Sequence, residues 1–167
     1  LMLLCAVVLA VILYDLLRPV NKSLALLATL FGMLATAVQA AYSLQLIEAL
    51  FPLGTAAYLK AFTLEQLNAL VSLSLKSHDV GFGIVLLFFG PFFLVSGFLI
   101  FRSTYFPRTI GILYQIAGLA YLTNGVVLVL APHFAARIFA IIALPAFVGE
   151  TSFCLWLLFK GVNMEQW

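Results

Sequence analysis

The chain has 167 residues, of which 65% are hydrophobic and only 8% are charged. Because soluble domains carry about 25% charged residues, this composition excludes an ordinary water-soluble domain and indicates a protein largely surrounded by lipid. The formal net charge of +2 is too small to indicate a nucleic-acid partner.

Catalytic and metal-binding motifs are missing from the sequence. The two cysteines, Cys5 and Cys154, each lie inside an apolar stretch, so we expect small buried residues rather than a disulfide framework. No metal-ligand spacing, nucleophile elbow, phosphate-binding loop or dinucleotide glycine pattern occurs. We therefore expect no metal, no cofactor and no enzymatic activity.

Apolar segments follow one another along the whole chain, over residues 1–14, 23–47, 80–101, 108–131 and 134–159. The last four approach or exceed the roughly 20 residues that cross a bilayer as a helix. The first begins within a hydrophobic run, and we expect it to be the remnant of a longer span. Period-2 alternation is absent, and a backbone in lipid must satisfy its own hydrogen bonds. The predicted fold is an all-α membrane protein, a polytopic bundle of transmembrane helices forming one domain over residues 1–167.

The connection between the second and third segments has helical signals of its own. Thr63-Leu-Glu-Gln66 has the form of a capping box. Leucines and a valine then recur at helical spacing from Leu64 to Leu75. We predict a short amphipathic helix over about 64–76 at the outer interface. The alternative is a helical extension that leads into the segment 80–101.

The distribution of lysine and arginine predicts the orientation of the chain. Five basic residues fall in the first and third connections and at the C-terminus, namely Arg18, Lys22, Arg102, Arg108 and Lys160. Three fall on the other side, namely Lys60, Lys76 and Arg137. We therefore expect these two connections and the C-terminus to face the cytoplasm.

The segments 80–101 and 108–131 both carry glycines at a strict spacing of seven. In an antiparallel hairpin that turns near Thr104, the two rows mirror each other, as the pairs Gly97 with Gly111, Gly90 with Gly118, and Gly83 with Gly125. Small residues let membrane helices approach closely, and a period of seven keeps each row on one face of a left-handed crossing. We predict a tight helix-packing seam. Chance is the alternative, because glycine is common in membrane helices.

Glu150 is the sharpest candidate for function, because it lies near the middle of the last predicted span. An ionisable side chain at this depth is costly unless it is protonated or has a partner. One interpretation is a proton carrier or ligand anchor. The other is a neutral carboxyl that hydrogen-bonds Asn124, Gln39 or a backbone carbonyl freed by Pro145.

His78 and Asp79 lie at the outer mouth of the segment 80–101. Asp79 is expected to cap the start of that helix, since a carboxylate is favoured there. The alternative is a His–Asp pair tuned for proton exchange or metal binding. His133 lies on the same side of the membrane but belongs to no ligand-spacing motif.

The depth of the polar residues along the helices predicts a cup that opens to the outside, with Glu150 beneath it. Its members would be Gln39, Gln45, Glu48, His78, Asp79 and Asn124. From these we take Glu150, His78, Asp79, Asn124 and Gln39 as candidate ligand-binding residues.

Several strings resemble a known family: RPVNKSLALLATLFG (18–32), SHDVGFGIVLLFFG (77–90), LIFRSTYFPRTIGIL (99–113), LAYLTN (119–124) and LPAFVGE (144–150). They are similar to the bacterial membrane-protein family called domain of unknown function 4386, in the right order over nearly the whole chain. The resemblance implies a multi-helix integral membrane protein of bacterial type, and we expect it to lie in the cytoplasmic membrane. This family has no assigned activity, so the resemblance implies no role for any residue.

Two classes of function fit these observations. The first is a non-enzymatic membrane protein that binds a partner protein, a lipid or a small ligand, including an accessory subunit of a membrane complex. The second is a small proton-coupled transporter that uses Glu150, with His78 and Asp79 at its mouth. The short chain shows no internal repeat, so a transporter would need to be a homo-oligomer, and this favours the first.

Overall fold

The computed structural model describes residues 1–162, apart from the side chains of residues 132 and 136–138. This part of the chain contains helices and no strand, with the elements α1 (Met2–Leu17), α2 (Lys22–Glu48), η1 (Phe51–Leu53), η2 (Ala57–Ala61), α3 (Leu64–Arg102), α4 (Arg108–Leu130) and α5 (Pro132–Phe159). Within residues 1–162, four helices are long and apolar enough to cross a membrane, and α1 is a shorter apolar helix. The predicted all-α membrane bundle is confirmed.

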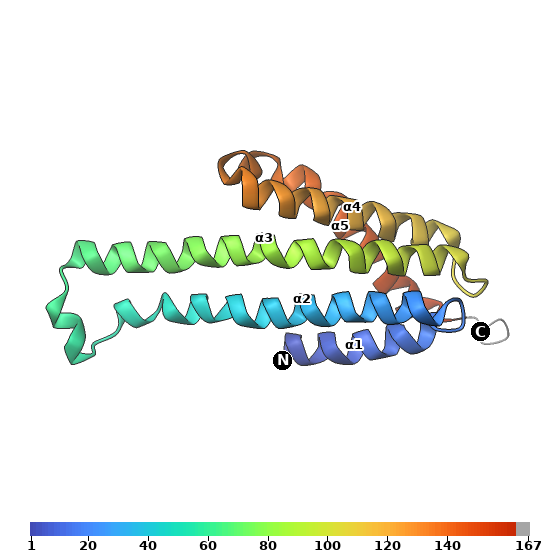
Figure 1. Ribbon diagram of the computed structural model, residues 1–167, viewed down its shortest axis with the longest axis horizontal. Helices are drawn as coiled ribbons and strands as arrows, with labels where there is room; N and C mark the ends of the chain where they lie inside the picture. The colour runs from blue at the N-terminus through green and yellow to red at the C-terminus, as the bar shows by residue number, and fades with distance from the viewer. Residues whose placement is uncertain (163–167) are drawn as a thin grey trace.

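Consecutive helices run antiparallel and pack on one another, with α3 at the centre between α2 and α4 (Figure 1). Helix α1 packs on α2, and α5 packs on α4. The turns at 18–21 and 103–107 lie at one end of the bundle, to which α5 returns. This end carries the five basic residues that were predicted to share one side, whereas the side chain of Arg137 lies outside the described residues.

The separate amphipathic helix predicted over 64–76 is wrong, because α3 runs without a break from Leu64 to Arg102. The capping box does form: Thr63 Oγ1 accepts from the Gln66 backbone N–H, and the Gln66 side chain accepts from the Thr63 N–H. No glycine or proline follows Thr63 until Gly81, so nothing ends the helix near residue 76. The alternative of a helical extension is therefore correct, and Asp79 lies inside a helix and cannot cap one.

Helix α3 is longer than the membrane is thick. Its 39 residues extend about 58 Å, whereas the hydrocarbon core measures about 30 Å. Figure 1 shows its N-terminal part reaching beyond α4 and α5, together with the end of α2 and the turns η1 and η2. The end of α2, the turns η1 and η2 and the start of α3 therefore project from the rest of the bundle.

The mirrored glycine rows meet in the structure as their register predicts. A Cβ added at Gly97 would lie 2.8 Å from the Gly111 carbonyl oxygen, and one added at Gly118 would lie 2.9 Å from the Gly90 oxygen. At the third pair, a Cβ on Gly125 would lie 2.9 Å from the Gly83 oxygen. Backbone therefore touches backbone along α3 and α4, which is the contact that holds helices together in lipid.

The main buried cluster lies toward the end with the turns 18–21 and 103–107. It draws side chains from all five helices, with the large residues Leu17, Phe93, Ile100, Phe106 and Phe153 among them. The turn 103–107 is tied to α1, because the Tyr105 hydroxyl donates to the Leu16 carbonyl oxygen at 2.5 Å. Burial raises the pKa of Tyr105, which keeps the phenol protonated as a donor.

The close contact along the seam predicts that adding one methyl group to a seam glycine destabilises the protein. Gly97→Ala places its Cβ 2.8 Å from two backbone atoms that cannot move aside, Gly111 O and Gln115 N. We expect this overpacking to destabilise the protein by about 1–3 kcal/mol, measured as a lower Tm in detergent. Gly54→Ala is the control outside the seam, since its nearest neighbouring atom lies 3.3 Å away and its φ of −78° suits alanine. Equal losses of Tm in the two variants would contradict the seam.

Candidate functional site

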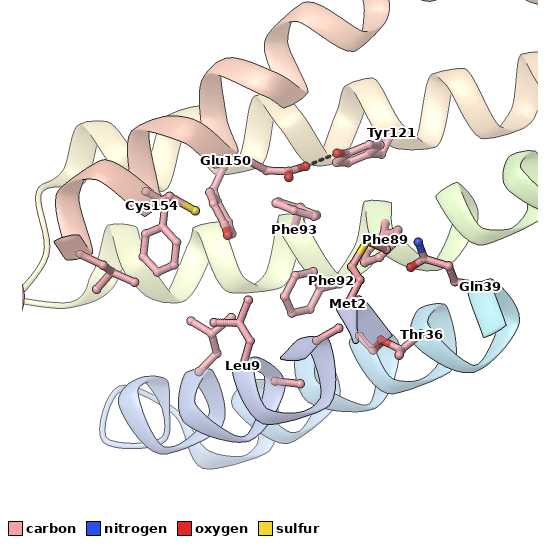
Figure 2. A pocket seen from close by; sticks show the side chains of 17 residues that line it. Met2, Leu9, Thr36, Gln39, Phe89, Phe92, Phe93, Tyr121, Glu150 and Cys154 are labelled. Carbon is pink, nitrogen blue, oxygen red and sulfur yellow. Dashed lines mark hydrogen bonds between the residues drawn. The ribbon is translucent and has the colours of Figure 1, made fainter. Parts of the chain in front are cut away.

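A pocket of about 310 Å³ lies inside the bundle, and all five helices contribute to its walls. Helix α3 supplies Phe89, Phe92 and Phe93, as Figure 2 shows, and α1 supplies Met2 and Leu9. Helices α1 and α5 do not form a packed pair in the described part of the chain. The pocket therefore fills the space between them, over a floor of α3.

Glu150 of α5 and Tyr121 of α4 form the polar wall of this pocket (Figure 2). The Tyr121 hydroxyl donates a hydrogen bond to Oε1 of Glu150. No described residue donates to Oε2 of Glu150. Glu150 is half-buried near the middle of the span Phe139–Phe159, so this carboxyl lies at membrane depth. An unpaired carboxylate would be costly there, and Tyr121 offsets part of that cost.

Aromatic rings surround the Glu150–Tyr121 pair. The Phe93 ring lies 5.1 Å from the Tyr121 ring and 4.6 Å from the Tyr114 ring, measured between centroids, and Tyr114 lies 4.9 Å from Phe153. All four residues line the pocket, and none of the lining residues is basic. The pocket therefore presents ring faces and one carboxyl group, which together favour an apolar molecule with a hydrogen-bond donor or a positive charge.

Helix α5 reaches this position because Gly149 allows it to approach α4 closely. A Cβ added at Gly149 would lie 2.8 Å from the Leu113 carbonyl oxygen and 3.0 Å from the Ala117 Cβ. The neighbouring residue, Glu150, is thereby held against α4 within reach of Tyr121. Sequence reasoning missed both Gly149 and Tyr121, although antiparallel register between the last two spans would have placed Glu150 near the tyrosines of α4.

Asn124 lies beside a second, smaller cavity on the other side of the Glu150–Tyr121 pair. This cavity of about 230 Å³ is also lined by Phe82, Tyr121 and Glu150. Asn124 is only 3% exposed, and its Oδ1 has no hydrogen-bond partner in the described residues. Asn124 was one of the partners predicted for Glu150, but the partner is Tyr121.

Of the other predicted residues, Gln39 lies near Glu150 and the His78–Asp79 pair does not. Gln39 lines the main pocket together with Thr36, opposite Glu150 (Figure 2). His78 and Asp79 line neither cavity. They face each other at 3.8 Å between Nδ1 and Oδ1, and the Asp79 side chain is 78% exposed, so this is a surface pair. The His78 ring packs against Tyr42, with 4.8 Å between centroids.

The structure does not gather the predicted polar cup into one cavity. Between His78 and the main pocket, a second apolar cluster fills the space where α2 meets α3, built on Ala35, Tyr42 and Val85 with Phe82 and Phe89 packed against it. Equal depth along the helices was thus a poor guide to which side chains share a space. Gln39 and Glu150 meet at one pocket, and Asn124 and Glu150 meet at another.

The chain matches the family described as "Domain of unknown function (DUF4386)" over residues 1–161. The chain belongs to the DUF4386 family. An uncharacterized protein of Archaeoglobus fulgidus is 29% identical to this DUF4386 chain over 163 residues, which cover 96% of this chain and 79% of the relative. No solved structure matches it. The family membership expected from the sequence is confirmed, and it assigns no activity.

The Glu150–Tyr121 hydrogen bond makes a prediction for this DUF4386 protein. Tyr121→Phe leaves a carboxyl oxygen without a donor in an apolar setting, and we expect a loss of about 1–3 kcal/mol, read as a lower Tm in detergent. Tyr114→Phe is the control from the same aromatic wall, because the Tyr114 hydroxyl makes no hydrogen bond to a described residue. If the control loses as much stability as Tyr121→Phe, the hydrogen bond to Glu150 does not contribute the predicted stability.

Proposed function

We propose that this DUF4386 protein is a non-catalytic membrane protein that binds a small, mainly apolar ligand in the main pocket. Glu150 would anchor the ligand through a hydrogen-bond donor or a positive charge. The observation that carries the proposal is a pocket of about 310 Å³ at membrane depth with aromatic walls and a single carboxyl group. Pockets for small molecules have this character, with mostly apolar walls and few polar groups that fix orientation.

The state of the Glu150 carboxyl supports an anchoring role. Tyr121 donates to Oε1, and no described residue donates to Oε2, which can accept a hydrogen bond from a ligand. A ligand that supplies this donor would remove part of the cost of placing a carboxyl in the membrane. No histidine, lysine or second carboxyl group is among the described residues that line the pocket, which favours ligand binding over acid–base chemistry on a substrate.

The test is native mass spectrometry of the protein extracted gently from its own membrane. We expect the wild-type chain to carry one small molecule and Glu150→Gln to retain about tenfold less of it, because a hydrogen bond to a charged group is worth about 1.5 kcal/mol or more. Glu48→Gln is the control, since Glu48 is an exposed carboxyl of α2 outside the pocket.

Two results would overturn the proposal. If both variants retain the molecule equally, Glu150 does not anchor it. If the wild-type chain carries a stoichiometric protein partner and no small molecule, an accessory subunit of a membrane complex is the better description.

A proton-coupled transporter is the second candidate, and one observation favours it. The Glu150–Tyr121 pair lines two cavities, one that Gln39 also lines and one that Asn124 also lines. The Glu150 carboxyl could therefore exchange a proton on two sides. Protein reconstituted into liposomes with an internal pH dye separates the candidates. A proton flux that Glu150→Gln abolishes and Glu48→Gln preserves would favour transport.

We further propose that the end with the turns 18–21 and 103–107 faces the cytoplasm, because five basic residues gather there. Alkaline phosphatase requires disulfides and so becomes active only outside the reducing cytoplasm. We expect a fusion after Lys160 to be inactive and a fusion after Ala131 to be active. The reverse pattern would invert the orientation.

A further inference from the structure

A second charged feature lies where α3 turns into α4, apart from the Glu150 pocket. Arg102 ends α3 and Arg108 begins α4, and both are exposed. Together with apolar side chains of both helices they line one groove of about 750 Å³. None of the described residues that line this groove is acidic.

The two guanidinium groups are oriented by aromatic rings. Cζ of Arg102 lies 5.3 Å from the centroid of Phe98, and Cζ of Arg108 lies 5.8 Å from that of Phe101. Stacking on a ring leaves the N–H donors of a guanidinium at its edge available for an oxyanion. Within residues 1–162, neither arginine has a carboxylate partner, whereas Arg18 at the same end pairs with Asp15 at 3.4 Å.

The start of α4 adds to the positive character of this end. Its N-cap residue, Pro107, makes no side-chain cap hydrogen bond, so the first N–H groups of the helix lack that partner. Helix N-termini with free N–H groups favour anions. Within residues 1–162, no acidic side chain lines the groove to balance this charge.

An apolar strip continues from the arginines along α4. Ile112, Ile116 and Leu119 line the groove, and they are 46%, 45% and 58% exposed. The distance along α4 from Arg108 to Leu119 is about 16 Å at 1.5 Å per residue. This is about half of the roughly 30 Å hydrocarbon core, the depth of one leaflet.

We propose that this groove is a binding site for an anionic phospholipid, with the phosphate on the guanidinium groups of Arg102 and Arg108 and one acyl chain along the apolar strip. The order of chemical groups along the groove matches that of such a lipid. Charged groups lie at the end of the bundle, and apolar side chains follow toward the middle of the membrane. Basic groups at membrane surfaces attract anionic headgroups by about 1 kcal/mol each. The site is independent of the proposed function at Glu150.

The experiment is native mass spectrometry of the detergent-purified full chain, offered equal amounts of phosphatidylglycerol and phosphatidylcholine with identical acyl chains. We expect the wild-type protein to retain phosphatidylglycerol preferentially. Arg102→Gln and Arg108→Gln should each lower this preference about fivefold, and the double variant about 25-fold. Soluble glycerophosphoglycerol, the same headgroup without acyl chains, should not bind at these concentrations.

The matched control is Arg18→Gln, which removes one positive charge from the same end of the bundle but outside the groove. We expect it to keep the wild-type preference. Arg102→Lys and Arg108→Lys keep the charge and lose the fork of donors, so an intermediate preference is expected even if a glutamine variant fails to fold.

Three outcomes would overturn the proposal. Equal retention of the two lipids by the wild-type chain would show that the groove does not select charge. An equal loss in Arg18→Gln would show that overall surface charge, and not the groove, attracts the lipid. Binding of the soluble headgroup as tightly as the lipid would show a phosphate site without a role for the apolar strip.

Discussion

The structure depends on the contact of backbone with backbone between α3 and α4. In lipid, apolar side chains gain little from leaving one hydrocarbon surface for another, so close van der Waals contact must hold the helices. Three glycine pairs provide that contact and fix the register of α3 against α4 over most of the membrane. Gly149 extends the same device to α5, which brings Glu150 against α4. The glycine positions thus determine how closely the helices approach one another, and with that where the walls of the pocket lie.

The few charged groups of the chain are sorted by depth. Glu150 lies near the middle of its span, where Tyr121 donates a hydrogen bond to it and aromatic side chains line the same pocket. Arg102 and Arg108 lie at one end of the bundle, each stacked on a phenylalanine of α3. In a chain with only 8% charged residues, this sorting gives the pocket and the groove opposite chemical character. The pocket is lined by a carboxyl group and the groove by two guanidinium groups.

Patterns set by the spacing of residues along the chain could be predicted from the sequence. The spans, the capping box at Thr63 and the mirrored glycines all follow from spacing along the chain and match the structure. The start of α3 was misjudged because hydropathy marks where lipid begins, whereas the backbone hydrogen bonds continue into water. Tyr121 was missed because a hydroxyl partner is set by the rotation of two helices about their axes, which periodicity in one helix does not report. The rotation of α3 about its axis likewise decides that His78 lines neither of the cavities that Glu150 lines.

The unbroken length of α3 has a mechanical consequence. The part of α3 that projects from the bundle and the aromatic floor of the pocket belong to one continuous helix of 39 residues. The glycine contacts hold α3 against α4 from Gly83 to Gly97, so a displacement of the projecting end would have to bend the helix. Pro91, which lacks an N–H and weakens the helix locally, lies among Phe89, Phe92 and Phe93. The helix therefore bends most easily at the floor of the pocket, and such a displacement would shift the side chains that line it.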